Sequence, residues 1–359
     1  MNLAVRPSSI SDVSLMAYLE KLETGRPVHL GLLTNPRSRQ NTLFPIHHRL
    51  AKLGMSPDDS VQTIHPSEIQ NALTYLLFHR NINVLAINGG DGTIHTVVNV
   101  LWNLLDEVET LSGVACPAPL LLLLNGGTMN MASRAMNTKG NATRTVKWFI
   151  NEYTGKPLGG VPIRKTSLME IRRDTDRQRT VGLIFGSELT YNALWMYALF
   201  GQGYLGLARL CLEAAVGAHF NTSLWRKYGH MLTPPTTPLE VDGVTYPNYS
   251  AVLASTVDLT LALGLIQTVL VAEGSPGFFA KIVLETDPKR LIALIPSLMS
   301  EARHPRILDI PSASLLRVRG AFTLDGELYP APENDPTAPV TVSVCSRRLH
   351  AVHNHESAI

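Results

Sequence analysis

The first half of the chain alternates short aliphatic runs with helical patterns, and this alternation constrains the fold more than any other feature. Residues 28–34, 84–88 and 120–124 are mostly apolar, which is typical of strands buried on both faces. Each run ends at an asparagine that is followed by proline or glycine, which is a turn signal. After the run at residues 84–88, the apolar residues of 97–105 have helical spacing. Strands and helices that alternate with short connections predict a mostly parallel α/β sheet, with loops gathered at its strand ends.

The second half of the chain reads differently, because strand and turn signals replace the alternation. Residues 166–171 and 180–185 flank a charged tip, which indicates a hairpin, and residues 239–246 contain a second hairpin signal around an Asp-Gly pair. With 359 residues, the chain is long enough for two domains. We therefore predict an α/β domain at residues 1–158 and a β-rich domain at residues 159–359.

The composition excludes several classes of protein. Charged residues make up 17 % of the chain, against about 25 % in ordinary soluble proteins. The formal net charge is +2, which excludes a disordered charged tail and argues against a nucleic-acid binder, since such a protein needs a basic excess. The three cysteines have no metal-ligand spacing and support neither a disulfide framework nor a zinc site, so a reducing compartment fits best.

One apolar stretch, residues 251–272, reaches the length of about 20 residues that a membrane-spanning helix needs. Asp258 and Gly264 interrupt it, and several of its residues are β-branched, so we interpret it as strand, turn and strand. The first 22 residues mix charged and apolar side chains and lack the apolar core of a signal peptide. The sequence thus predicts a cytoplasmic protein.

The strongest functional signal is the loop Gly89-Gly90-Asp91-Gly92-Thr93 between a predicted strand and a predicted helix. Glycines let backbone N–H groups approach an anion closely, and the following helix directs its positive N-terminal end to the same place. Asp91 adds a carboxylate suited to holding a metal ion beside bound phosphates. For the glycines alone, a tight turn without a chemical role is an equally good interpretation.

The wider loop NGGDGTIHTVVNVL (residues 88–101) closely resembles the nucleotide loop of diacylglycerol and sphingosine kinases, and NAD kinases have a related loop. Three more motifs follow the order of the lipid kinases, namely TNPRSR (34–39), LLNGGTMNMASRAM (123–136) and LDGELYPAP (324–332). The resemblance extends from residue 28 to residue 349 and points to the bacterial diacylglycerol kinase type.

This resemblance implies a fold and an activity. The fold would combine an α/β domain of the NAD kinase and diacylglycerol kinase type with a β-rich, sandwich-like domain, and a cleft would lie between them. The activity would be transfer of the γ-phosphate of ATP, with Mg²⁺, to a hydroxyl of diacylglycerol or a related lipid at a membrane surface. The net charge of +2 argues against a nucleic-acid partner and predicts only peripheral contact with the membrane. A homodimer is left open.

The resemblance also assigns roles to single residues. Those expected to bind ATP are Asn35, Ser38, Thr63, Gly89, Gly90, Asp91, Gly92, Thr93, Thr128 and Asn130. Asp91 would also hold the Mg²⁺ of the nucleotide and act in catalysis with Asp325 and Glu327, the acidic pair of the last motif. The family favours Glu327 as the base, although these residues alone leave the choice open. Without the resemblance, Asp325-Gly326 would predict a simple hairpin turn.

Several positions depart from the family pattern. His95 and Thr96 stand where the family usually has Asn-Glu, and Arg39 replaces a usual glycine. Residues 275–282 lack the acidic side chains that hold a structural Mg²⁺ in some bacterial members. A catalytically weakened nucleotide- or lipid-binding homologue therefore remains an alternative. An NAD kinase is another, although the motif at residues 324–332 argues against it.

The acceptor lipid would need an apolar surface. Residues 194–220 offer one, and its aromatic members are Trp195, Tyr197, Phe200 and Tyr204. Ordinary core packing explains an aromatic stripe equally well.

Overall fold

The computed structural model divides into two compact units, which we describe separately. Unit 1 comprises Met1–Thr166 with Arg348–Ile359, and unit 2 comprises Ser167–Arg347. The division of function between domains at residues 1–158 and 159–359 stays a prediction. The structure describes residues 10–43, 46, 51–127, 130–174, 179–200, 213, 216–217, 220, 222–229, 235, 237–261, 266–269, 271, 275–294, 297 and 304–354.

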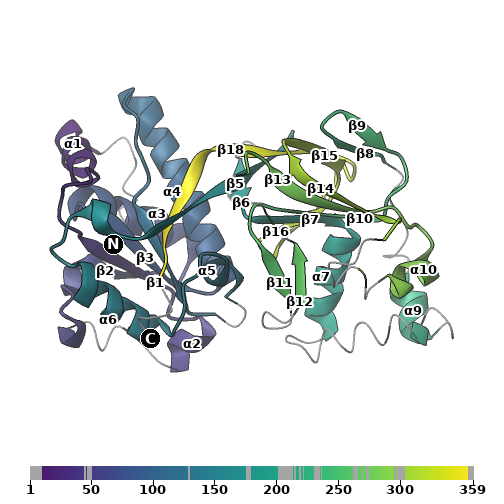
Figure 1. Ribbon diagram of the computed structural model, residues 1–359, viewed down its shortest axis with the longest axis horizontal. Helices are drawn as coiled ribbons and strands as arrows, with labels where there is room; N and C mark the ends of the chain where they lie inside the picture. Colours follow the sequence, from purple (N-terminus) through teal and green to yellow (C-terminus); the bar gives the residue numbers. More distant parts are fainter. Residues whose placement is uncertain are drawn as a thin grey trace. The chain divides into compact units, whose positions relative to one another are not determined.

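Unit 1 is built on a parallel sheet, shown with its helices in Figure 1. The strand order is β2-β1-β3-β4, and every neighbouring pair is parallel. Beyond β4, Ala351 of β18 pairs in parallel with Leu121. The predicted parallel α/β sheet is thus confirmed. Its strands are β1 (Leu30–Thr34), β2 (Ser60–Gln62), β3 (Val84–Gly89) and β4 (Leu120–Asn125).

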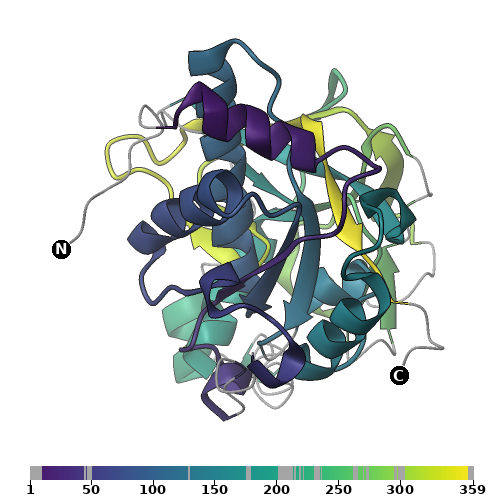
Figure 2. The same cartoon turned by 90° about the vertical axis from the view of Figure 1, so that its left-hand side faces the viewer.

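Helices cover both faces of this sheet (Figure 2). Leu32, Ala86 and Leu122 face a core that Val146 and Phe149 of α6 complete, while α4 packs against β3 and α3. Because the strands are covered on both sides, they read as continuous aliphatic runs in the sequence. The helices are α1 (Asp12–Lys21), α2 (Arg39–Leu43), α3 (Pro66–Thr74), α4 (Asp91–Ser112), α5 (Met131–Ala135) and α6 (Ala142–Tyr153).

Helix α4 is the element that positions the predicted glycine loop. It begins directly after Gly90, which serves as its N-cap residue without a side chain to cap the helix. It ends at Gly113, whose φ of 69° lies in the left-handed region that glycine adopts without strain. The 22-residue helix therefore directs its N-terminus at the loop that follows β3.

The described strands of unit 2 lie in three sheets. The first is antiparallel and has the order β14-β13-β10-β7-β16-β17, the second joins β18, β15, β8 and β9 and also contains β5 and β6, and the third pairs β11 with β12. The strands of the first are β7 (Ile184–Glu188), β10 (Ala251–Ser255), β13 (Phe278–Val283), β14 (Ile307–Ala313), β16 (Phe322–Leu324) and β17 (Glu327–Tyr329). Those of the second are β5 (Ile163–Arg173), β6 (Thr180–Gly182), β8 (Leu239–Val241), β9 (Val244–Tyr246), β15 (Leu315–Arg319) and β18 (Pro339–Val352).

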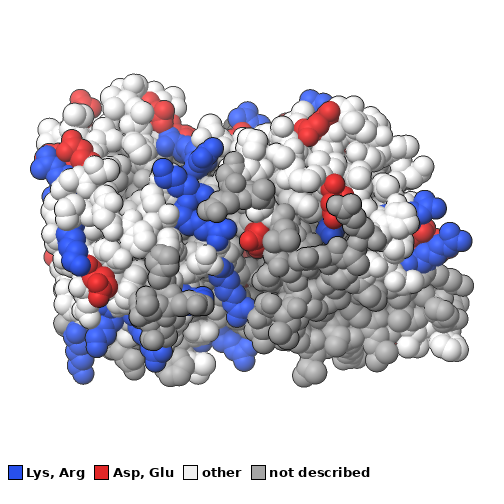
Figure 3. Space-filling model, viewed as in Figure 1, with Lys and Arg blue, Asp and Glu red and all other residues white. Residues whose placement is uncertain are grey.

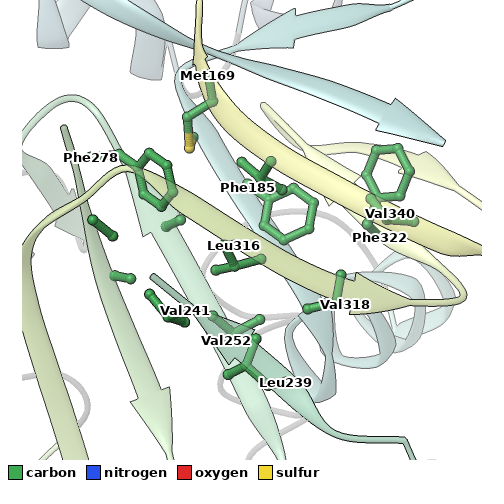
Figure 4. Packing of buried hydrophobic residues seen from close by; sticks show 14 of the residues in the cluster. Met169, Phe185, Leu239, Val241, Val252, Phe278, Leu316, Val318, Phe322 and Val340 are labelled. Carbon is green, nitrogen blue, oxygen red and sulfur yellow. The ribbon is translucent and has the colours of Figure 1, made fainter. Parts of the chain in front are cut away.

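The core of unit 2 consists of inward-facing side chains from the first two sheets, and Figure 4 shows its packing. Met169 and Leu316 come from one sheet, and Phe185, Phe278 and Phe322 come from the other. Alternate residues of each strand contribute to this core, as in a β-sandwich. The predicted β-rich, sandwich-like part is confirmed.

The described part of residues 251–272 forms strands, as predicted. It contributes β10 to the sheet that also contains β7 and β13, and the short strands β11 (Leu259–Leu261) and β12 (Ile266–Val269) pair with each other. Among the described residues, we find no helix that combines the length and the apolar character needed to cross a membrane. Where Figure 3 shows described residues, most of the surface is formed by residues other than Lys, Arg, Asp and Glu, in keeping with the charge-poor composition.

The remaining helices of unit 2 are α7 (Leu189–Phe200), α9 (Ser223–Tyr228) and α10 (Pro288–Ala293). The predicted apolar wall begins in α7. Trp195 is half-buried, and its ring lies 6.0 Å from that of Tyr228 in α9. Tyr204 and the side chains of Tyr197 and Phe200 lie outside the described residues.

Glu188 occupies an unusual position at the junction of β7 and α7. Its φ of 56° lies in the left-handed region, which is uncommon for a residue other than glycine or asparagine. Burial raises the pKa of its carboxyl from 4.5 to about 7, against the opposing effect of a hydrogen bond from the Tyr249 hydroxyl (3.5 Å). The folded protein therefore retains this proton at pH values where the unfolded chain has released it.

We expect Glu188 to make stability fall as the pH rises. Its contribution is fully present below pH 4.5 and is lost as the pH approaches about 7. The loss is at most about 3 kcal/mol, and partial exposure of the side chain reduces it. Thermal unfolding at about pH 5 and about pH 8 should show wild type losing stability relative to Glu188→Gln. Parallel pH profiles of the two proteins would contradict the assignment.

Candidate functional site

The carboxyl ends of the four parallel strands in unit 1 bring the predicted nucleotide residues to one edge of the sheet. Asn35 follows β1, Thr63 follows β2, Gly90 follows β3 and Gly126 follows β4. Ligands of open α/β sheets bind at this edge, because the loops and helix N-termini converge there. The sheet topology alone therefore places four predicted segments together.

Hydrogen bonds connect the first loop to the glycine loop. Asn35 Nδ2 donates to Thr93 Oγ1 at 2.9 Å, and the backbone N–H of Gly90 donates to Ser38 Oγ at 3.2 Å. The backbone N–H of Asn35 also donates to Asn88 O at 2.9 Å. The structure thus brings Asn35, Ser38, Gly90 and Thr93 together, as the sequence predicts.

The glycine loop and the loop after β4 approach each other backbone to backbone. Gly126 N donates to Gly89 O at 3.1 Å. A Cβ atom added to Gly127 would lie 2.5 Å from Gly90 Cα, and one added to Gly126 would lie 2.8 Å from Gly89 N. Side chains at these two positions would push the loops apart, so close packing of the loops requires glycine there.

Asp91 links the start of α4 to the start of α5. Its Oδ1 accepts a hydrogen bond from Ala132 N at 3.0 Å. Asn130 lies just before α5 with a φ of 52°, and its side chain both accepts from Gly127 N (2.8 Å) and donates to Gly127 O (3.2 Å). Asp91 and Asn130 therefore stabilise the two loops, whatever else they bind. Thr128 lies outside the described residues.

Thr63 lies at the same edge of the sheet, directly after the outer strand β2. It is buried, and its backbone N–H donates to Thr34 O at 2.9 Å. Glu68 organises the turn that follows by accepting hydrogen bonds from His65 N (3.1 Å) and Ile64 N (2.7 Å). These backbone donors lower the pKa of the Glu68 carboxyl.

The two departures His95 and Thr96 are accommodated within α4. His95 is buried, and its Nε2 lies 3.4 Å from Asn99 Nδ2 one turn later. Thr96 Oγ1 donates to Gly92 O at 2.8 Å. Both side chains thus contact their own helix, and the loop geometry does not depend on the usual Asn-Glu pair.

Two asparagines of the site are missing from the sequence prediction. Asn41 Nδ2 donates to Asn35 O (2.8 Å) and to Asn88 O (3.1 Å), which fixes the first loop against β3. Asn88 is fully buried, and its side-chain amide has no hydrogen-bond partner among the described residues. Only its place directly before the glycine loop could have drawn attention to Asn88, and no local signal marks Asn41.

This edge of unit 1 fits a phosphate group. The N-terminus of α4 has no side-chain cap, and a Cβ built on Gly90 meets only Gly127 Cα, at 3.5 Å. Backbone N–H groups and the helix dipole favour an anion at such a place. No group of three His, Cys, Asp or Glu residues suited to a metal occurs in the described part of the chain. Asp91 as a single carboxylate suits Mg²⁺ that arrives on phosphates.

The second group of predicted residues forms a hairpin in unit 2. Asp325 and Gly326 connect β16 to β17 with φ values of 53° and 91°, as in a type I′ turn. Asp325 Oδ1 accepts hydrogen bonds from Leu183 N (2.8 Å) and Ile184 N (2.9 Å). The alternative prediction of a hairpin is therefore correct for the backbone.

A second Asp-Gly turn in unit 2 has the same arrangement. Asp242 and Gly243 connect β8 to β9 with φ values of 48° and 83°. Asp242 Oδ1 accepts hydrogen bonds from Ser314 N (3.0 Å) and Leu315 N (2.9 Å). Both aspartates thus attach the tip of a hairpin to a neighbouring strand, which indicates a structural use of the carboxylate.

The two hairpins differ in the residue that starts the second strand. This residue is Val244 in β9 and Glu327 in β17, and both are exposed. Glu327 lies close to Tyr329, where burial and the carboxylates of Asp325 and Glu327 raise the pKa of the tyrosine to about 12. Glu327 therefore adds an accessible carboxylate that the β8–β9 hairpin lacks.

Residues 275–282 contribute to β13 and contain no acidic side chain. Phe278, Ala280 and Ile282 face the core, and Lys281 pairs with Asp309 of β14 at 3.3 Å. A structural metal ion has no ligand set in this segment.

We expect Gly127→Ala to destabilise unit 1, because the added Cβ meets the Gly90 backbone. Overpacking of this kind costs about 1–3 kcal/mol. The matched control is Gly25→Ala, since a Cβ at Gly25 meets nothing within 4 Å. The melting temperature of each variant, measured by thermal unfolding, shows the loss of stability. Equal melting temperatures for the two variants would show that the loops separate without cost.

Comparison with known proteins agrees with these features. Residues 29–156 match the family model described as the diacylglycerol kinase catalytic domain. No curated protein matches the sequence.

Two solved structures from Bacillus anthracis str. Sterne share the fold. One is described as a "putative diacylglycerol kinase", with a TM-score of 0.57 and 15 % identity over 92 % of this chain and 98 % of the other. The other is described as a diacylglycerol kinase, with a TM-score of 0.55 and 14 % identity over the same shares. Residues 29–156 are thus similar to the catalytic domain of diacylglycerol kinases, and the two solved structures share the fold of this chain.

Proposed function

We propose that this protein is an ATP-dependent lipid kinase that phosphorylates a hydroxyl of diacylglycerol or a related lipid. The observation that carries the proposal is the edge of unit 1, where the uncapped N-terminus of α4 meets two closely packed glycine loops. The match to the diacylglycerol kinase catalytic domain covers these loops.

The nucleotide phosphates would bind at the N-terminus of α4. Backbone N–H groups of Gly90–Thr93 supply donors, and Asn35 and Ser38 order the loop through their contacts to Thr93 and Gly90. Such a cradle acts by positioning and by stabilising charge, which is the main requirement of phosphoryl transfer. Bound Mg²⁺ would neutralise charge on the phosphates, and Asp91 is the carboxylate placed to hold it.

Glu327 is our candidate for the general base. Two backbone N–H groups engage the Asp325 carboxylate, and Asp242 makes the same contacts in a hairpin without a predicted role. Glu327 is exposed and adjacent to that turn. A carboxylate there can accept the proton of the lipid hydroxyl as the new bond to phosphorus forms. Asp325 would then position the hairpin.

We propose that the protein meets its acceptor lipid at a membrane surface by peripheral contact. With only 17 % charged residues, the chain has many uncharged side chains for such contact.

A lipid panel tests the proposal most directly. Purified protein is incubated with Mg²⁺, γ-labelled ATP and vesicles that contain diacylglycerol, a monoacylglycerol, a ceramide or a sphingoid base, with soluble NAD in a parallel reaction. We expect label in a lipid and none in NAD. Label in NAD alone would establish the NAD kinase alternative, and ATP binding without transfer to any acceptor would establish the non-catalytic one.

The acidic pair gives a sharper prediction. Glu327→Gln should lower kcat by about 10²–10⁴-fold, because loss of a general base costs about this much. Asp325→Asn should lower kcat far less, since the amide oxygen of asparagine can still accept both backbone hydrogen bonds. The reverse order of the two losses would identify Asp325 as the base. Circular dichroism of each variant checks that the fold is retained.

A further inference from the structure

Arg173 is a buried cation in the apolar interior of unit 2. It lies at the end of β5, where it follows Met169 and Ile171 on the face that points into the sandwich core. Its relative exposure is 8 %, whereas the side chain of its neighbour Arg172 is 69 % exposed. The alternation of a strand therefore directs one arginine to solvent and the next one inward.

The guanidinium of Arg173 crosses from one sheet to the other and contacts the base of the β16–β17 hairpin. Its Cζ lies 4.9 Å from the centre of the Phe322 ring, which is a cation–π distance. Its Nη2 donates long hydrogen bonds to Gly320 O (3.5 Å) and Tyr329 O (3.4 Å). Gly320 precedes β16 and Tyr329 ends β17, so one side chain holds both strands of the hairpin.

The aromatic rings around Arg173 extend this anchor. The ring of Phe322 stacks on that of Tyr329, with ring centroids 4.7 Å apart and ring planes 6° from parallel. The ring centroid of Phe185 in β7 lies 5.6 Å from that of Phe322. A planar guanidinium can add to such a stack, whereas the compact ammonium of lysine cannot do so in the same way. The anchor therefore depends on the shape of arginine as well as on its charge.

Burial of a cation among these rings is costly for stability. An apolar residue of similar volume usually packs in a core at no greater cost, because it loses no hydration. Arginine at this place is therefore better explained by a demand for defined geometry than by its contribution to stability.

The β17 strand needs an anchor of this kind. It has three residues and stands at the edge of its sheet, where β16 is its neighbour among the described strands. Short edge strands open more easily than central ones, because few hydrogen bonds hold them. Glu327 is the first residue of β17, so motion of this strand would move its carboxylate.

We propose that Arg173 is a positioning residue for the phosphoryl transfer, which it serves by fixing the β16–β17 hairpin at its base. Asp325 fixes the same hairpin at its tip through Leu183 and Ile184. With both ends held, the carboxylate of Glu327 keeps one orientation toward the acceptor hydroxyl. This proposal rests on the proposed lipid kinase activity and on Glu327 as its base.

The first arm of the test measures the hairpin itself and needs no activity. Hydrogen–deuterium exchange of peptides that cover residues 320–329 is compared in wild type, Arg173→Met, Arg173→Lys and Arg172→Met. We expect faster exchange in this hairpin for Arg173→Met, a smaller change for Arg173→Lys and none for Arg172→Met. If exchange in this hairpin is unchanged in both Arg173 variants, the proposal is overturned. If Arg173→Met does not fold, the comparison of Arg173→Lys with wild type still provides the test.

The second arm measures kinetics on the lipid that the panel identifies. Arg173→Met should lower kcat by up to about 100-fold with little change in the KM for ATP, because a carboxylate displaced by about 1 Å loses that much. Arg173→Lys should recover part of the rate, and Arg172→Met should behave as wild type.

A double variant separates positioning from general damage to the fold. If Arg173 acts through Glu327, then Arg173→Met added to Glu327→Gln should cause no further loss of kcat. If Arg173→Met lowers kcat by the same factor in the Glu327→Gln background as in the wild-type background, the proposal is overturned. Absence of transfer by wild-type protein to every lipid would overturn the proposed function instead, and the exchange arm would still decide whether Arg173 anchors the hairpin.

Discussion

The close approach of two glycine loops is the contact on which the candidate site depends. Gly127 meets Gly90 with no space for a Cβ atom, and Gly126 donates to Gly89 O at 3.1 Å. Because backbone meets backbone, the ends of β3 and β4 are held at a fixed separation, and α4 and α5 begin beside each other. Asp91 then bridges the two helices through Ala132 N. Main-chain geometry at this place therefore favours an anion before any charged side chain contributes.

The same packing gives a structural role to polar side chains that the sequence predicts to bind a nucleotide. Asp91 and Asn130 were expected to bind a nucleotide, and the structure shows that each already stabilises a loop. Asn88 is the opposite case, since its buried amide has no partner among the described residues, which costs free energy. This local cost falls beside the glycine loop, where we propose that a ligand binds.

The sequence predicted what depends on local pattern. Aliphatic runs located β1, β3 and β4, and the two Asp-Gly pairs located hairpins, since a type I′ turn requires the backbone angles that these residues adopt. It could not predict contacts between distant segments. Nothing near Asn41 indicates that it bridges Asn35 and Asn88, and nothing near Arg173 indicates that it reaches Phe322. Burial of a polar residue is a property of the packed chain, so local periodicity does not reveal it.

In unit 2, a simple turn and the proposed catalytic hairpin use the same kind of Asp-Gly pair. In both, the aspartate carboxylate accepts two backbone hydrogen bonds from a neighbouring strand. A motif search therefore cannot assign catalysis to aspartate from the Asp-Gly pair, since a purely structural turn needs the same atoms. What distinguishes the β16–β17 hairpin is Glu327 at the start of its second strand and Arg173 beneath its base. An exposed carboxylate on a short edge strand gains a defined direction only when the strand is held at both ends. The buried arginine and the turn aspartate supply these two attachments.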